Sequence, residues 1–216
     1  LAVTRDYLLS GVKKAAEDAS RVFNKFLPLR SEPQLRNKHS LASHADPGLV
    51  RRIESFSALP ELSLGWALLY YYQHFGFPVP GHQACALNSL YVAHDMTHVI
   101  SGISITAAGE IALSAFQLAM QPNDVNESAL LASLITHEAG FVSVNPTIDP
   151  DSASLDTDSA AHLLSTEMAR GSCCHGDFSL VDHFELAHLP LSEVRSKFNV
   201  LMPETPNDGH HFLWPI

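Results

Sequence analysis

Residues 84–121 decide the fold, and they read ACALNSLYVAHDMTHVISGISITAAGEIALSAFQLAMQ. Two helical segments lie in this stretch, over about 84–101 and 105–121, because apolar residues recur there without period-2 alternation. Ser101-Gly102 ends the first segment, since glycine readily adopts the left-handed backbone that closes a helix. The stretch therefore predicts a helical hairpin with a tight turn.

Four side chains of this hairpin can bind a metal ion. His94 and His98 share one face of the first helix because they are four residues apart, and Asp95 lies within reach of that face. Residue 104 is the midpoint between 98 and 110, so Glu110 should lie at the height of His98. Buried carboxylates are costly unless a cation or hydrogen-bond donors compensate them. The spacing predicts a metal site of His94, Asp95, His98 and Glu110, although a histidine pair that binds nothing is the competing interpretation.

Cap signals place further helices along the chain. Asp46-Pro47 resembles an N-cap followed by proline at the first helical position. Gly76 ends an apolar helix, Asp158 is an N-cap candidate with Gly171 at the helix end, and Pro190 suits a helix start. We predict an all-α, single-domain bundle of about seven helices, over 4–26, 46–56, 62–75, 84–101, 105–121, 125–144 and 158–170, followed by two short helical segments near 180–187 and 191–199.

The predicted single domain spans residues 1–216. It comprises a basic N-terminal helix and connector over 1–45, a core over 46–200 and a coil tail over 201–216. No internal repeat or domain boundary is evident in the sequence.

Charge is distributed unevenly along the chain. Residues 1–52 hold ten of the thirteen Lys and Arg and five acidic residues, whereas residues 53–216 hold three basic and eighteen acidic residues. The basic segment either packs on the acidic remainder or contacts anionic lipid headgroups. Nucleic acid is excluded as a partner, because no basic patch carries interleaved aromatic residues and most of the chain would repel phosphate.

The cysteine content indicates a reducing, intracellular compartment. Cys85, Cys173 and Cys174 make no disulfide framework, and adjacent cysteines rarely bridge. No run of 18 apolar residues exists, so the sequence predicts no spanning helix. The sequence begins at Leu1, and a trimmed targeting peptide stays an open alternative.

Other motif candidates carry less weight. His137-Glu138 lacks the second histidine of a zinc-protease helix, because Phe141 stands at that position. Cys173-Cys174-His175 has poor spacing for a metal site. Nucleophile-elbow, P-loop and dinucleotide-binding fingerprints are absent from the sequence.

The motif His94-Asp95-x-x-His98, followed by Glu110 after eleven residues, resembles the signature of the Coq4 family of coenzyme Q (ubiquinone) biosynthesis proteins. The likeness extends over residues 50–200, and an unusual segment lies at 78–86. Four further stretches resemble that family: LPELSLGWALLYYYQHFG (59–76), GEIALSAFQ (109–117), EMARGS (167–172) and DHFELAHLPLSEVRSKFNV (182–200).

This resemblance implies an all-helical protein with one divalent metal ion, zinc being favoured over magnesium, manganese or iron. It implies His94, Asp95, His98 and Glu110 as metal ligands and catalytic residues. The implied activity is oxidative decarboxylation at ring position C1 of a prenylated hydroxybenzoate or a related prenylated aromatic acid. The alternative is a non-catalytic isoprenoid-binding scaffold that organises quinone-pathway enzymes.

The resemblance also implies partners and a location. Expected partners are a prenylated aromatic or isoprenoid lipid, a membrane surface bound peripherally, other quinone-biosynthesis enzymes and a second copy in a homodimer. The expected location is the cytoplasm and peripheral membrane in a bacterium, or the matrix face of the mitochondrial inner membrane in a eukaryote.

An isoprenoid tail would need an apolar channel, for which the sequence offers aromatic candidates, although plain core packing is the competing interpretation. Arg170 either pairs with a substrate carboxylate or phosphate, or forms a structural pair with an acid. Tyr91 either hydrogen-bonds a ligand carboxylate or belongs to the core. The candidate lining residues are Tyr70, Tyr71, Tyr72, Phe75, Phe77, Phe116 and Met120.

Overall fold

The described part of the structure, a computed structural model, is helical. It comprises residues 45–85, 91–123, 126–127, 129–131, 133–134, 158–204 and 211–212. Among these residues there is no strand, and the extended pairing consists of two isolated antiparallel bridges, Ser63 with Pro190 and Ile103 with His211. The prediction of an all-α protein is confirmed.

The chain divides into two compact units, which are described separately. The first comprises Leu1–Ala42 and Ser104–Ser172, and the second comprises Ser43–Ile103 and Cys173–Ile216. The prediction of one domain over residues 1–216 stays a prediction.

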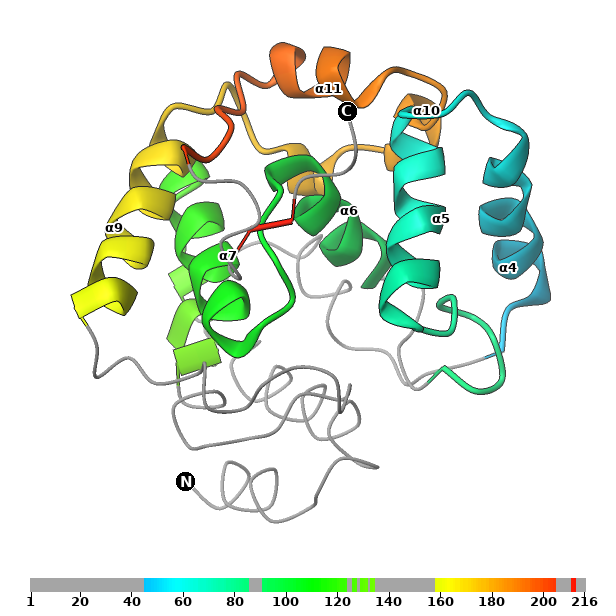
Figure 1. Cartoon of the computed structure of the whole chain (residues 1–216), viewed down its shortest axis with the longest axis horizontal. Helices are drawn as coiled ribbons and strands as arrows, with labels where there is room; N and C mark the ends of the chain where they lie inside the picture. Colours follow the sequence, from blue (N-terminus) through cyan, green and yellow to red (C-terminus); the bar gives the residue numbers. More distant parts are fainter. Residues whose placement is uncertain are drawn as a thin grey trace. The chain divides into compact units, whose positions relative to one another are not determined.

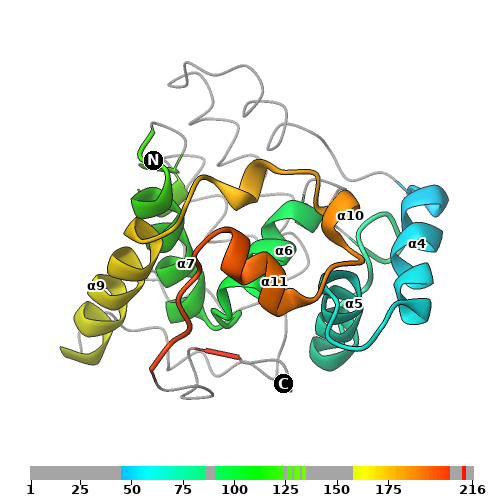
Figure 2. The same cartoon turned by 90° about the horizontal axis from the view of Figure 1, so that it is seen from above.

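The second unit is built around helix α5 and helix α6. Its elements are α4 (Pro47–Glu54), the 3-10 helix η3 (Ser55–Ala58), α5 (Leu64–Phe75), α6 (Tyr91–Ser101), the 3-10 helix η5 (Phe178–Leu180), α10 (His183–Leu186) and α11 (Leu191–Lys197). Helix α5 contacts α4, α6, α10 and α11, and α11 also contacts α6. Figure 2 shows α11 beside α6, and α5 next to α4.

The helix ends of the second unit follow the predicted signals. The Asp46 carboxylate accepts a hydrogen bond from the Leu49 backbone N–H at 3.0 Å. Ser63 caps α5 by accepting from the Trp66 N–H, and Gly76 closes this helix with a φ of 67°. Aspartate and serine acceptors are expected at helix starts and a left-handed glycine at a helix end, and these boundaries lie close to their predicted positions.

Helix α6 begins later than predicted. Residues 84 and 85 are not helical, because the chain makes a tight turn after Gly81, whose φ is 94°. The Ala84 N–H donates to Nδ1 of His82, and the Cys85 N–H donates to the His82 carbonyl. These two bonds hold residues 82–85 in a turn ahead of the helix.

The first unit contains α7 (Ala107–Met120) and α9 (Asp158–Ser172), which lie side by side in Figure 1. Gly171 does not end α9 as predicted but lies within it. A Cβ atom at Gly171 would stand 2.2 Å from the Phe116 carbonyl oxygen, so glycine permits the close contact between the two helices.

Several predictions fall outside the described residues. The helix over 4–26 and the connector that follows it belong to this group, as does most of the basic segment over 1–52. The described residues between 126 and 134 are helical, in agreement with the predicted helix over 125–144.

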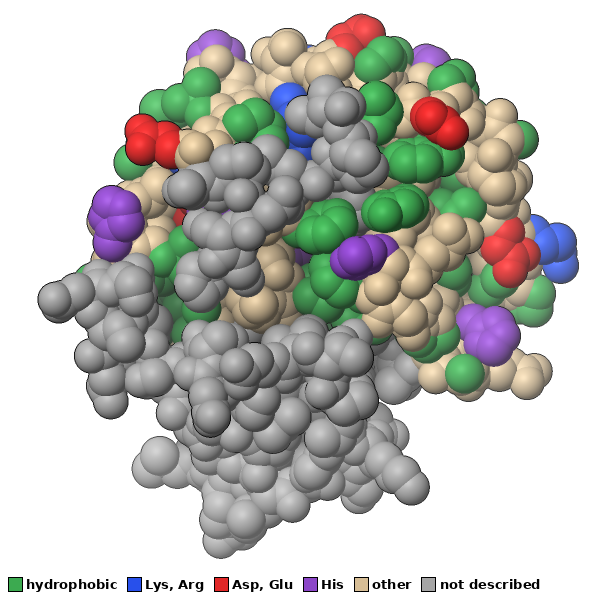
Figure 3. Space-filling model, in the orientation of Figure 1, with side chains coloured by type: hydrophobic (Ala, Val, Ile, Leu, Met, Phe, Trp, Pro, Cys, Tyr) green, Lys and Arg blue, Asp and Glu red, His purple; other side chains and the backbone are tan. Residues whose placement is uncertain are grey.

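Two further properties concern the surface. No helix within the described ranges is both long and apolar enough to span a bilayer. On the face drawn in Figure 3, carboxylate side chains (red) are scattered singly, and few basic side chains (blue) are visible. The carboxylates of the described residues that are visible on this face form no single patch there.

Candidate metal centre

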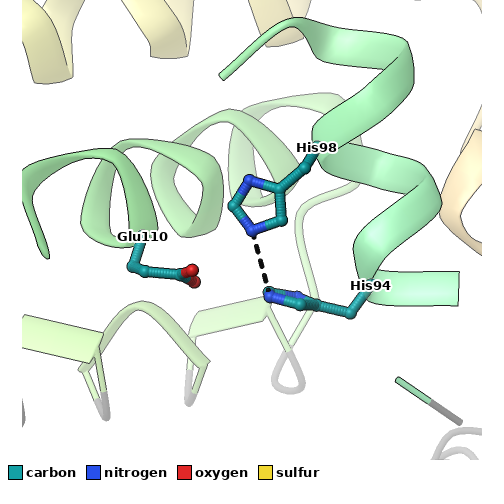
Figure 4. Close-up of side chains that lie close together, drawn as sticks. All are labelled: His94, His98 and Glu110. Atoms are coloured by element: carbon teal, nitrogen blue, oxygen red, sulfur yellow. Dashed lines mark hydrogen bonds between the residues drawn. The ribbon is translucent and has the colours of Figure 1, made fainter. Parts of the chain in front are cut away.

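Helix α6 presents two imidazole rings to each other. His98 is 1% exposed and His94 is partly buried. Their Nε2 atoms lie 3.2 Å apart, and the rings meet edge-on with centroids 4.7 Å apart (Figure 4). The four-residue spacing on one helix places both rings on the same side, as predicted.

A backbone carbonyl fixes the tautomer of His98. Nδ1 of His98 lies 3.0 Å from the carbonyl oxygen of Ile103, in a buried setting. Because a carbonyl only accepts, the His98 ring donates here and carries its proton on Nδ1. The lone pair of its Nε2 atom therefore faces His94. A histidine that ligates a metal through one nitrogen commonly donates its other N–H to a carbonyl in this way.

The turn after α6 leads directly to Glu110. Gly102 has a φ of 74°, and its N–H donates to the His98 carbonyl at 2.9 Å. Thr106 then caps α7, because its hydroxyl accepts from the Gly109 N–H at 3.0 Å. A Cβ atom at Gly109 would stand 2.1 Å from the Ser104 carbonyl oxygen. Glycine thus lets the first turn of α7 lie against the loop and brings Glu110 into the first helical turn.

The structure brings His94, His98 and Glu110 together as a candidate metal site. One ligand atom from each residue lies within 4.8 Å of the other two, and the carboxylate points toward the rings (Figure 4). Two nitrogen ligands of a tetrahedral zinc ion at about 2.0–2.1 Å would lie about 3.3 Å apart. The observed Nε2 separation of 3.2 Å fits this donor spacing. His94 and Glu110 are only partly buried, so solvent can reach the group.

Asp95 is not part of this three-residue group. The hydroxyl of Tyr72 donates to Oδ2 of Asp95 at 2.7 Å, and both side chains are buried. Burial raises the pKa of Tyr72 well above its ordinary value, and the charge of Asp95 and the hydrogen bond to it raise that pKa further. Tyr72 is therefore a protonated donor near neutral pH, and it ties α6 to α5. Ligation by Asp95 stays a prediction.

Most candidate lining residues belong to the core. Tyr71, Tyr72, Phe116 and Met120 are buried, whereas Tyr70, Phe75 and Phe77 are partly exposed. The Tyr71 ring stacks near His98, with centroids 6.1 Å apart. A hollow of about 110 Å³ lies beside Trp66 and Tyr70, well below the roughly 300 Å³ at which small-molecule sites begin.

Arg170 has a structural partner. It forms a buried ion pair with Glu167, one turn earlier on α9, and its guanidinium lies 5.6 Å from the Phe116 ring centroid. Glu167 is fully buried and Arg170 is 6% exposed. Of the two interpretations of Arg170, the structural pair with an acid is the one present here.

Of the remaining candidates, Tyr91 lies beside the group. Its ring meets the His94 ring edge-on, with centroids 6.1 Å apart. Cys173, Cys174 and His175, all within the described residues, do not come together as a metal-binding group. His137 and Glu138 lie outside the described residues.

Sequence reasoning missed a buried cation that holds α6. Arg195 of α11 is 6% exposed and donates to the carbonyls of Ile100 at 2.9 Å and Val99 at 3.1 Å. These carbonyls lie in the last turn of α6, where a positive charge also favours the helix dipole. No local pattern could reveal contacts made across 95 and 96 residues.

Known proteins resemble this chain in fold. No protein-family model matches the sequence, and no curated protein matches it. One structural neighbour is a protein from Nostoc punctiforme PCC 73102 whose crystal structure is described as that of a "Putative ubiquinone biosynthesis protein". The TM-score is 0.54 at 16% sequence identity, over 93% of this chain and 96% of that chain. At this identity, the likeness shows a shared fold.

Proposed function

We propose that this chain is a Coq4-like protein of quinone biosynthesis that binds one divalent metal ion and acts on the ring of a prenylated hydroxybenzoate. The observation that carries the proposal is the convergence of His94, His98 and Glu110 within 4.8 Å. The fold likeness to a protein described as acting in ubiquinone biosynthesis supports the pathway. The motif spacing supports the family.

The proposed reaction replaces the ring carboxyl at C1 with a hydroxyl. The bond from the ring to the carboxyl carbon breaks and carbon dioxide leaves, while a new bond to oxygen forms at the same carbon. This exchange oxidises the ring, so an acid and half a molecule of dioxygen give a phenol and carbon dioxide. Dioxygen is therefore the second substrate of the proposed reaction.

The residues of the site have distinct roles in this proposal. His94 and His98 hold the ion through Nε2, and Glu110 contributes a carboxylate that offsets its charge. Three protein ligands leave positions for substrate oxygens, as in catalytic rather than structural zinc sites. The bound ion supplies Lewis-acid polarisation of a substrate carboxylate or phenolate. The Ile103 carbonyl orients His98, and Tyr72 with Asp95 holds α6 in place.

A non-catalytic scaffold is the second candidate function. The burial of Tyr71, Phe116 and Met120 favours it, because these side chains fill the core where an isoprenoid channel had been expected. Under this proposal the ion stabilises the helical hairpin. An isoprenoid lipid at a membrane surface, other quinone-pathway enzymes or a second copy of the chain would then be the partners.

Turnover of a defined substrate separates the two candidates. We expect the protein loaded with zinc, iron or manganese to convert prenylated 4-hydroxybenzoate to the C1-hydroxylated product, with dioxygen consumed and carbon dioxide released. Mass spectrometry of the product measures this. Glu110→Gln, which removes the charge but keeps the shape, should lower turnover at least about 100-fold.

The matched control is Glu61→Gln, a change at an exposed glutamate outside the metal group, which should leave turnover unchanged. If the wild-type protein binds metal and stays helical but turns over no tested ring acid, the scaffold is the better account.

A further inference from the structure

A short C-terminal segment pairs with the turn that follows α6. Ile103 and His211 form an isolated antiparallel bridge, and the Phe212 N–H donates to the Gly102 carbonyl at 2.8 Å. This hydrogen bond links Gly102 and Phe212, the residues next to the bridged pair. Ile103 and His211 are therefore a non-hydrogen-bonded pair of the antiparallel bridge. The N–H and carbonyl of Ile103 therefore face away from the C-terminal segment.

Both of these Ile103 groups bond back to α6. The carbonyl accepts from Nδ1 of His98 at 3.0 Å, and the N–H donates to the Ser101 hydroxyl oxygen at 3.2 Å. Ile103 is 2% exposed and His98 is 1% exposed. Bulk water therefore has little access to replace the carbonyl if the turn moves. The orientation of the His98 ring depends on where this one peptide group is held.

The C-terminal segment is anchored to α5 as well. The Phe212 ring lies 4.5 Å from the ring of His74 and 5.6 Å from that of Phe75, centroid to centroid. Both partners lie at the end of α5, and His211 is 6% exposed. Residues 211–212 thus connect the end of α5 to the turn after α6.

We propose that His211 and Phe212 are positioning residues for the metal centre, which they serve by holding the Ile103 carbonyl that sets the tautomer of His98. This inference rests on the proposed function, because the tautomer of His98 matters for metal binding. The tautomer itself is a property of the metal-free chain. Without the Phe212 hydrogen bond, the Gly102–Ile103 peptide groups lose an anchor. The His98 proton then moves in part to Nε2, where it blocks the lone pair that faces His94.

Two substitutions at one position test this inference. Phe212→Pro removes the backbone donor to Gly102 together with the ring, whereas Phe212→Ala removes the ring and keeps the donor. Nitrogen-15 NMR of histidine side chains in the metal-free protein reports the tautomer of His98. We expect the Nδ1–H form in the wild type and in Phe212→Ala, and a mixture of both forms in Phe212→Pro.

Metal affinity is the second measurement. Zinc titration against a competing chelator should show a loss of about 10- to 100-fold in Phe212→Pro and less than about threefold in Phe212→Ala. Circular dichroism must show unchanged helicity, and Phe184→Ala, a ring truncation in the same unit beside Phe56, controls for general loosening. A single Nδ1–H tautomer in folded Phe212→Pro would overturn the inference.

Failure of the proposed function gives a different result. If the wild-type protein binds no zinc, the proposed function is wrong. The NMR measurement would still show whether the C-terminal segment sets the His98 tautomer.

Discussion

His98→Ala is expected to lower the affinity for a divalent metal ion at least about 1,000-fold, which corresponds to about 4 kcal/mol of binding free energy. The side chain is 1% exposed, lies 3.2 Å from its partner nitrogen and is oriented by a carbonyl. Zinc titration with a competing chelator measures the loss.

His188→Ala is the matched control for this prediction. His188 is an exposed histidine of the same unit outside the metal group, so its removal should leave the affinity within about twofold. The His98 variant also loses the ring's hydrogen bonds to the Ile103 carbonyl and to His94, each worth about 1 kcal/mol of folding stability. Unchanged zinc affinity in folded His98→Ala would mean that the ion binds elsewhere.

Gly109→Ala is expected to destabilise the fold by about 3 kcal/mol or more. The new methyl group would stand 2.1 Å from the Ser104 carbonyl oxygen and 3.0 Å from the Thr106 hydroxyl. Both groups belong to the turn and cap that start α7, so the helix must shift away from the turn. Urea denaturation followed by circular dichroism measures the free energy of unfolding.

Gly176→Ala is the control for backbone strain without a steric clash. Gly176 has a φ of 80°, and a Cβ atom there would meet nothing within 4 Å. We expect a cost of about 1 kcal/mol, from the left-handed backbone alone. Equal losses in the two variants would show that the approach to Ser104 is not what constrains Gly109.

Local signals in the sequence predicted the helices well. The caps at Asp46 and Gly76 lie where they were predicted, because each depends on neighbouring residues. Two predicted helix boundaries were wrong because other interactions form at those positions. The backbone N–H groups of Ala84 and Cys85 both donate to His82 and form a turn there. Gly171 provides close packing and does not end its helix.

The candidate metal group was predictable for the same reason. His94 and His98 share one helix face, and only a short turn separates His98 from Glu110, so spacing alone brings the three together. Helical geometry also put Asp95 near this group, but Tyr72, 23 residues earlier, supplies a hydrogen bond to it. A contact of this kind depends on tertiary packing, which periodicity does not encode.

The support around the site could not be predicted. Arg195 and Phe212 reach the end of α6 and its turn from positions far along the chain. Each contacts this part of the chain through backbone carbonyls. Every residue has a backbone carbonyl, so no sequence pattern shows which carbonyls accept these hydrogen bonds.

The most direct test of the proposed metal centre is an anomalous difference map from crystals of the wild-type protein grown with zinc. A single strong peak is predicted about 2.0–2.1 Å from Nε2 of both His94 and His98, with a Glu110 carboxylate oxygen at about 2.0–2.2 Å. A map with the zinc peak elsewhere, or with Glu110 turned away from both imidazoles, would contradict the account.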